Sequence, residues 1–303
     1  MIKGILAISV CVLILSGVAI PIAMEAGNDT LAVVVIEGQS NAVYKGLGVD
    51  LMNATYPIPD HNLYYYGNNN GPIYQVYNTL NYDDTFRSYG IHSMFNGNSW
   101  KIGTPDAALA YEIQKKYDVD VLVINVGISG ANINFLEPQS DGGKYITGMV
   151  SHALKDARAY GDVQKCGFAW IQGESNKTTP VATYINEFNT KIMPMNESLG
   201  LKHCYMVQTR PYNSGNAAIA QLQIASTNPN VTLASTAPST FTIENGMLLS
   251  DNLHYTAEGF FVVGSQIGEK VTVSKPDYSL LLIIPTVAII ALAVVGLRIS
   301  KTS

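Results

Sequence analysis

Two short clusters in this chain carry side chains suited to nucleophilic catalysis. Ser40 lies in Gly38-Gln39-Ser40-Asn41, directly after an apolar run, where a tight turn could present its hydroxyl as a nucleophile. Asp251 and His254 stand three residues apart, so one turn can hold both and leave the imidazole free to act as a general base. Alternatively, Ser40 only caps a helix and His254 is structural.

Two further clusters carry hydrogen-bond donors. Gly130 lies in a loop after a second apolar run, where glycine lets the backbone turn and point an N–H into a cleft. Gln172 and Glu174 follow a third apolar run and bring a side-chain amide and a carboxylate. The alternatives are a nucleotide-binding loop around Gly130, which the missing G-x-G-x-x-G pattern disfavours, and an ordinary turn around Gln172.

Apolar, β-branched runs alternate with helical patterns through the middle of the chain. This alternation predicts an α/β fold, a three-layer α/β/α sandwich with a five-stranded parallel sheet. Ligands of such sheets bind beyond the carboxyl ends of the strands, where the four clusters lie. The predicted strands are 31–36, 119–126, 166–171, 203–208 and 231–234, and the predicted helices are 104–116, 148–160, 180–199, 215–227 and 256–270.

An insertion over residues 45–101 separates the first strand from the first helix. It carries eight of the 18 tyrosines, including Tyr64-Tyr65-Tyr66, and the run Asn68-Asn69-Asn70. Aromatic faces and side-chain amides suit contact with sugars, which offer both C–H faces and hydroxyls. Alternatively, the segment is an ordinary polar loop whose tyrosines pack on the sheet.

The two ends of the chain predict its location. Residues 1–26 contain a long uncharged run behind Lys3 and end in small residues, which indicates a signal peptide or an uncleaved N-terminal anchor. Residues 278–298 predict a transmembrane helix, and 299–303 a short cytoplasmic tail, because basic residues follow the apolar run. The alternative is a buried C-terminal helix. Residues 27–277 are then an extracytoplasmic domain at the cell membrane.

An extracytoplasmic location bears on the sequons and the cysteines. The chain is a candidate glycoprotein, because Asn-x-Ser/Thr motifs mark exposed loops in secreted chains. Cys166 and Cys204 both open predicted strands and either form a disulfide or remain two buried thiols. The sequons begin at Asn28, Asn53, Asn176, Asn196 and Asn230.

Composition excludes several classes of protein. With 47% hydrophobic residues the chain can build a full core, which excludes a disordered protein. The net charge of −5 and the lack of a Lys/Arg cluster argue against a nucleic-acid partner. The histidines are isolated and neither a zinc signature nor a P-loop occurs, so we expect no metal and no cofactor.

Taken together, the ordered clusters resemble those of the SGNH hydrolase superfamily, in particular the sialate O-acetylesterase and acetyl-xylan esterase relatives of carbohydrate esterase family 6. The matching blocks are GQSN at 38–41, WIQGE at 170–174 and DNLH at 251–254, and VGISGAN around Gly130 resembles the second block. The resemblance covers roughly residues 31 to 270 and implies the flavodoxin-like SGNH fold. Relatives often carry G-G-T and a later Trp after the second strand, where this chain has Ser129-Gly130-Ala131-Asn132 and Phe135.

The resemblance also implies a division of roles. Ser40 is the expected nucleophile, His254 its general base and Asp251 the residue that orients the imidazole. The backbone N–H groups of Ser40 and Gly130 and the amide of Gln172 are the expected oxyanion donors. Candidate substrate or supporting contacts are Gln39, Asn41 and Glu174.

The sequence therefore predicts a membrane-anchored, extracytoplasmic serine esterase that removes O-acetyl groups from carbohydrates such as sialic acid or xylan-like glycans. Its expected partners are the acetylated carbohydrate and the membrane. Two alternative functions remain open. The chain could be a catalytically inactive glycan-binding protein with the same fold, or an esterase for lipids or other small esters. The sequence predicts no oligomeric state.

Overall fold

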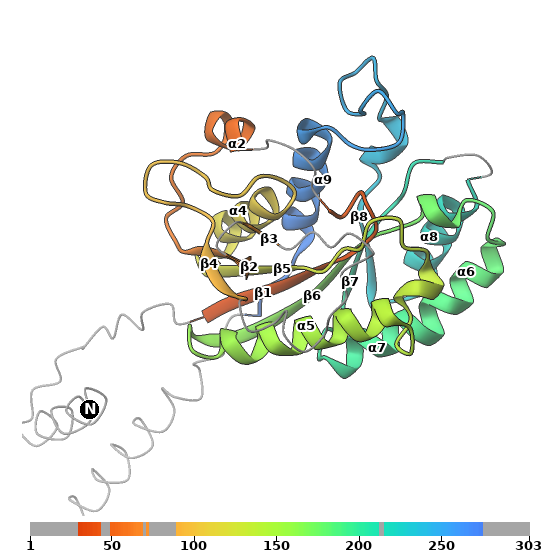
Figure 1. Cartoon of the computed structure of the whole chain (residues 1–303), viewed down its shortest axis with the longest axis horizontal. Helices are drawn as coiled ribbons and strands as arrows, with labels where there is room; N and C mark the ends of the chain where they lie inside the picture. The colour runs from red at the N-terminus through yellow and green to blue at the C-terminus, as the bar shows by residue number, and fades with distance from the viewer. Residues whose placement is uncertain (1–29, 44–48, 69–70, 73–88, 212–214, 275–303) are drawn as a thin grey trace, which may run out of the picture.

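A central β-sheet organises the fold, which the computed structural model describes for residues 30–43, 49–68, 71–72, 89–211 and 215–274 (Figure 1). Its strands are β1 (Thr30–Gly38), β2 (Leu63–Asn68), β3 (Gly71–Pro72), β4 (Gly90–Ser93), β5 (Asp120–Asn125), β6 (Asp162–Ile171), β7 (Cys204–Val207) and β8 (Val231–Ser235). Their order is β3-β2-β5-β1-β6-β7-β8, and β4 pairs with β2 beside this path. Neighbours from β2 to β8 run parallel, whereas β3 and β4 are antiparallel to β2.

The predicted α/β class is confirmed, but the predicted number of five strands is wrong. The five predicted runs correspond to β1, β5, β6, β7 and β8, while the sheet extends beyond β5 into β2, β3 and β4. β2 lies inside the segment 45–101, for which we predicted an insertion and no strand. Its tyrosines suit a strand, and Tyr65 and Tyr66 are buried on opposite faces of the sheet.

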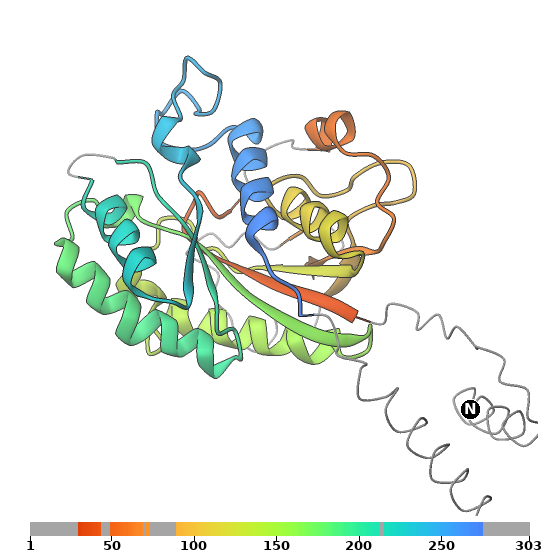
Figure 2. The same cartoon turned by 180° about the vertical axis from the view of Figure 1, so that it is seen from behind.

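Helices cover both faces of the sheet (Figures 1 and 2). α2, α4 and α9 pack with one core, and α5 to α8 pack with the other. β1 separates the two cores, since its residues are buried on both sides and alternate between them. The helices are α2 (Val49–Thr55), α4 (Asp106–Tyr117), α5 (Asp141–Ala157), α6 (Val181–Glu187), α7 (Met193–Ser198), α8 (Asn216–Thr227) and α9 (Ala257–Lys270).

The predicted helices all occur, with differences at their ends. α5 begins at Asp141 rather than at 148, because the Ser140 side chain caps it by accepting a hydrogen bond from the N–H of Gly143. The helix predicted over 180–199 consists of α6 and α7, joined by a π-helical turn at Phe188–Ile192. α2 was not predicted, because it is short and lies in the segment 45–101.

The predicted terminal segments 1–26, 278–298 and 299–303 lie outside the described residues. Within the described ranges, no helix has the length and apolar character needed to cross a bilayer.

The cysteines and sequons have clear structural positions. Cys166 and Cys204 are free, buried thiols in adjacent strands, and they point into opposite cores. Asn176 and Asn196 are buried, which contradicts the reading of these two sequons as exposed loops, since both side chains form interior hydrogen bonds. Asn53 and Asn230 are exposed, and Asn28 lies outside the described residues.

Candidate active site

The carboxyl end of β1 presents Ser40 in a tight turn. The turn is closed by hydrogen bonds from the N–H of Ala42 to the Gln39 carbonyl and from the N–H of Val43 to the Ser40 carbonyl. Gly38 precedes it with φ of 142°, and a Cβ at this position would lie 2.0 Å from the carbonyl oxygen of Ile171 in β6. Only glycine therefore allows β1 to end this close to its neighbour.

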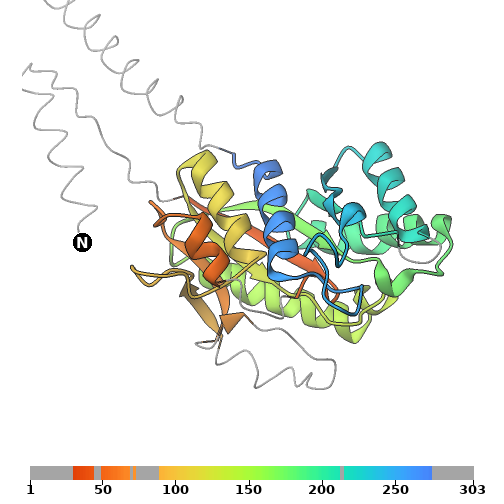
Figure 3. The same ribbon diagram turned by 90° about the horizontal axis from the view of Figure 1, so that it is seen from above.

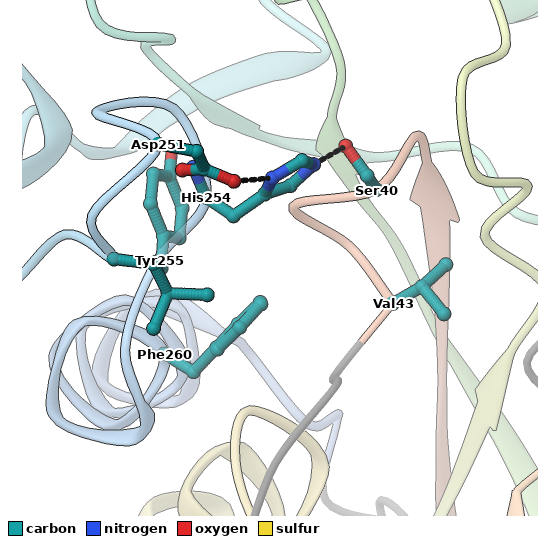
Figure 4. A pocket seen from close by; sticks show the side chains of 7 residues that line it. Ser40, Val43, Asp251, His254, Tyr255 and Phe260 are labelled. Carbon is teal, nitrogen blue, oxygen red and sulfur yellow. Dashed lines mark hydrogen bonds and ion pairs between the residues drawn. The ribbon is translucent and has the colours of Figure 1, made fainter.

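Ser40, His254 and Asp251 form a continuous chain of hydrogen bonds (Figure 4). His254 Nε2 lies 3.0 Å from Ser40 Oγ, and His254 Nδ1 lies 2.6 Å from Asp251 Oδ2. The three residues come from the two ends of the described domain, at the end of β1 and just before α9. With Nδ1 donating to the carboxylate, Nε2 is the nitrogen that can accept the serine proton.

The loop that carries Asp251 and His254 is held by its own backbone. Asp251 Oδ1 accepts hydrogen bonds from the N–H groups of Leu253 and His254, both at 3.0 Å. Partial burial raises the pKa of Asp251, but these bonds and the one from the imidazole outweigh it and lower the pKa to about 2. Arg210 Nη1 fixes the same loop by donating to the carbonyl and side-chain oxygens of Asn252, each at 2.9 Å. Asp251 is therefore ionised over the whole physiological range.

Asn41 joins the serine turn to the histidine loop. Its Nδ2 donates to the Leu253 carbonyl at 3.2 Å and to Glu174 Oε1 at 2.7 Å, and its Oδ1 accepts from the N–H of Tyr255 at 3.2 Å. Glu174 is buried behind the triad rather than in contact with it. Burial and the neighbouring carboxylate of Glu174 raise the pKa of Tyr255 well above its usual value. Asn41 and Glu174 thus support the loops and do not line the cavity.

Gln39 and Gln172 form an interior brace between the loops that follow β1 and β6. Gln39 Oε1 accepts from Gln172 Nε2 at 3.2 Å and from the N–H of Ser175 at 3.0 Å. Gln172 Nε2 also faces the Ala131 carbonyl at 3.3 Å and Asn176 Oδ1 at 2.5 Å. The amide of Gln172, expected to face the oxyanion, thus has acceptors inside the protein.

Gly130 lies in a left-handed conformation with φ of 79°, next to open space. Its carbonyl accepts a hydrogen bond from Ser175 Oγ at 3.2 Å. Among the described residues, neither its N–H nor that of Ser40 has an acceptor. Both N–H groups are therefore available to a ligand.

The triad opens into a cavity of about 260 Å³ (Figure 4). Its remaining walls are mostly apolar, so it suits a small acyl group better than a charged one. We did not predict these wall residues, although Val43 and Tyr255 adjoin the GQSN and DNLH clusters. The walls consist of Val43, Leu249, Tyr255 and Phe260. Within the described part of the chain, no group of three His, Cys, Asp or Glu side chains is placed to hold a metal ion.

Comparison with known proteins identifies a family and a fold. A family model described as "Carbohydrate esterase, sialic acid-specific acetylesterase" matches residues 30–273, which include all four clusters. This match confirms the resemblance seen in the sequence. No curated protein sequence matches the chain significantly.

Several solved structures share the fold. NanS is 12% identical with a TM-score of 0.55, over 80% of this chain and 96% of NanS. A protein from Arabidopsis thaliana is 17% identical with a TM-score of 0.52, over 78% of this chain and 96% of that one. A structure described as a novel carbohydrate acetylesterase from Xanthomonas citri is 13% identical with a TM-score of 0.51, over 78% of this chain and 56% of the other.

Proposed function

Because the chain belongs to the carbohydrate esterase family of sialic acid-specific acetylesterases, and is therefore a carboxylic ester hydrolase, we propose that Ser40, His254 and Asp251 are its catalytic triad. The observation that carries this proposal is the unbroken hydrogen-bond chain from Ser40 Oγ through the imidazole to the carboxylate. The reaction is removal of O-acetyl groups from a carbohydrate through an acetyl-enzyme.

In the first half of the reaction, Ser40 Oγ attacks the ester carbonyl carbon while His254 Nε2 takes its proton. The imidazolium is stabilised by Asp251, which remains ionised because its pKa is about 2. The negative oxygen of the tetrahedral intermediate accepts hydrogen bonds from the free N–H groups of Ser40 and Gly130. The C–O bond to the sugar then breaks, and the sugar hydroxyl leaves with the proton from His254.

In the second half, His254 takes a proton from water, whose oxygen attacks the acetyl carbonyl on Ser40. A second tetrahedral intermediate collapses, acetate leaves and the proton returns to Ser40 Oγ. The interior position of the Gln172 amide gives it the role of bracing the loops around the oxyanion rather than binding the oxyanion itself.

The size of the cavity favours the acetyl group over longer acyl chains. A volume of about 260 Å³ is shared between the acyl group and part of the alcohol. The family description favours acetylated sialic acid as the alcohol part, and xylan-like glycans are the second candidate. A lipid esterase needs room for a long chain, which this cavity does not offer.

The test is acetate release by the full-length chain from an aryl acetate, acetylated sialic acid and acetylated xylan. Ser40→Ala should lower kcat by about 10⁴-fold or more on every substrate. Ser226→Ala is the matched control, because Ser226 is an exposed serine on α8 that bonds only within its own helix. If folded enzyme releases no more acetate than Ser40→Ala, the triad is not catalytic and a glycan-binding role replaces it.

We propose an extracytoplasmic location from the sequence of the two ends. Residues 1–26 direct export, and residues 278–298 anchor the domain, with 299–303 in the cytoplasm. Deleting residues 278–303 should release the protein from the membrane fraction of its host. Protease added outside intact cells should digest residues 27–277. A full-length chain found in the cell's soluble fraction would contradict this location.

A further inference from the structure

A second cavity of about 280 Å³ lies between the end of α2 and the loop that precedes α4. It shares no wall residue with the cavity at Ser40. Figure 3 shows α2, α4 and α9 side by side on the same face of the sheet. We call it the α2 cavity, and the wall residues used below are Asn53, Tyr56, Ile58, Phe95, Asn98 and Trp100.

The aromatic rings of the α2 cavity are fixed by packing. Tyr56 stacks on Tyr111 with ring centroids 4.2 Å apart, and its hydroxyl donates to Glu112 Oε1 at 2.6 Å. Trp100 packs edge-on against Phe95 and Tyr111, at 5.4 and 5.9 Å. Since these rings are already held in place, a ligand does not have to order them on binding.

The polar groups of the α2 cavity are all neutral. Trp100 is only 1% exposed, and its indole N–H has no acceptor among the described residues. This N–H is shielded from solvent, so the donors that the described residues offer to a ligand are the side-chain amides. Asn53 uses its Oδ1 to accept from the Trp100 backbone N–H at 3.0 Å, which leaves its amide N–H groups for a ligand. Asn98 adds an exposed amide.

We propose that the α2 cavity binds one neutral sugar ring of a glycan chain, as a binding site separate from the triad. Aromatic and apolar walls match the C–H faces of a pyranose, and the two side-chain amides match its hydroxyls. A volume of about 280 Å³ holds one ring rather than an oligosaccharide. Among the described residues, no charged side chain lines the cavity, so they offer an anionic sugar no counter-ion.

The position of the α2 cavity suggests its use. Phe260 lines the cavity at Ser40, and the next residue, Phe261, contacts Tyr56 with ring centroids 5.1 Å apart. Adjacent residues of one helix, α9, therefore connect the wall of the cavity at Ser40 with the wall of the α2 cavity. Resting on the proposed function, this arrangement would hold a polymeric substrate at a neutral residue while an acetyl group is cleaved at Ser40.

The experiment measures binding without turnover. Full-length Ser40→Ala is made in a host that does not N-glycosylate, so that no glycan on Asn53 occupies the cavity. Its mobility is measured in gels containing deacetylated xylan, a neutral glucan or polysialic acid. We expect a neutral polysaccharide to retard the protein through the α2 cavity. Any retardation by polysialic acid, which the site at Ser40 can bind, should not depend on the α2 cavity. Binding should also change the emission of Trp100, which lines the cavity, whereas the second of the two tryptophans, Trp170, lies in the opposite core.

Two variants in the Ser40→Ala background localise the binding. Ile58→Asp places a charge at a side chain that is 65% exposed, and should raise Kd at least about tenfold, because the carboxylate must be desolvated against a neutral ligand. Asn98→Ala removes one hydrogen bond and should raise Kd about threefold. Ile219→Asp is the matched control, an exposed isoleucine on α8 near the other edge of the sheet, and should bind as the parent does.

Retardation lost in Ile58→Asp and kept in Ile219→Asp supports the proposal, whether or not the wild-type chain proves to be an esterase. No retardation by either neutral polysaccharide overturns it, even if acetate release is normal. Equal retardation of Ile58→Asp and its parent also overturns it, because the sugar is then bound elsewhere.

Discussion

Asn41 and Glu174 lie 133 positions apart in the chain, and their side chains meet behind the triad in a buried hydrogen bond of 2.7 Å. The same Asn41 amide reaches the Leu253 carbonyl, and its oxygen accepts from the backbone of Tyr255. The position of His254 relative to Ser40 therefore depends on an asparagine next to Ser40, the proposed nucleophile, and on a carboxylate at the end of β6.

Asn41→Ala should lower kcat more than it changes KM. The substitution removes two hydrogen bonds to the histidine loop and a third to Glu174, while the cavity walls are unchanged. We expect a decrease in kcat of roughly 10- to 100-fold, as for other supporting residues, and a loss of unfolding free energy of about 1–3 kcal/mol. Steady-state kinetics on an aryl acetate and denaturant unfolding measure the two effects.

Glu174→Gln is the matched comparison for Asn41→Ala. Glutamine keeps a side-chain oxygen that can accept the hydrogen bond from Asn41 Nδ2. The decrease in kcat of Glu174→Gln should therefore be smaller than that of Asn41→Ala. If Asn41→Ala keeps its kcat and only KM rises, Asn41 contacts substrate instead of holding the loop.

Asp251→Asn should abolish most activity and change its pH dependence. In the wild type Asp251 has a pKa of about 2, below its unfolded value of 3.8, so its contribution to stability is present above pH 3.8 and is lost as the pH falls toward 2. Asp251 is therefore ionised from pH 5 to 8, so any change of kcat/KM with pH in that range does not come from Asp251. The asparagine variant should lose about 10⁴-fold in kcat, because its amide favours the wrong imidazole tautomer.

A pH–rate profile of kcat/KM on an aryl acetate tests this assignment. A profile that stays flat from pH 5 to 8, with chemistry limiting, would rule out His254 as the general base. Glu197→Gln, at an exposed acid on α7 over the opposite face of the sheet from α9, controls for the loss of a surface charge.

Glu37 gives the fold a stability that decreases as the pH rises. It is completely buried in β1, and burial raises its pKa from 4.5 to about 7, opposed by a hydrogen bond from Asn196. Below pH 4.5 the carboxyl is protonated in both the folded and unfolded states. Between pH 4.5 and 7 only the folded state keeps the proton, so unfolding becomes easier by up to about 3 kcal/mol.

Glu37→Gln removes this titration while keeping the shape of the side chain. The unfolding free energy of the wild type minus that of Glu37→Gln should fall by about 3 kcal/mol from pH 4.5 to pH 8. Guanidinium unfolding at both pH values measures the difference. A difference that is constant with pH would mean that Glu37 ionises as readily in the folded protein as in the unfolded chain.

The sequence predicted the central strands and the meeting of Ser40, His254 and Asp251, since both depend on local patterns. The run Leu31–Ile36 is apolar at every position because helices cover both faces of β1. GQSN and DNLH lie in loops at the carboxyl ends of the parallel strands, which is where ligands of such sheets bind. The strands at one edge of the sheet, β2, β3 and β4, were not predicted. The tyrosines of β2 alternate less clearly between the two faces of the sheet than the residues of the central strands, and they adjoin polar residues. Leu249 and the interior role of Gln172 depend on contacts between loops remote in sequence, which no local pattern encodes.

Gly38→Ala should be severely destabilising, because the turn that presents Ser40 depends on close approach to β6. The new Cβ would lie 2.0 Å from the Ile171 carbonyl oxygen, at a φ of 142° that side chains rarely adopt. Either β1 or β6 must move, so we expect a loss of more than about 3 kcal/mol in unfolding free energy, together with loss of esterase activity.

Gly97→Ala is the matched control, since Gly97 has a positive φ of 86° but no atom within 4 Å of the added Cβ. Its loss should be near 1 kcal/mol, from backbone strain alone. Equal thermal midpoints for the two variants would contradict this argument. They would show that the protein accommodates a Cβ beside Ile171 without loss of stability, and that glycine is needed at position 38 only for its positive φ.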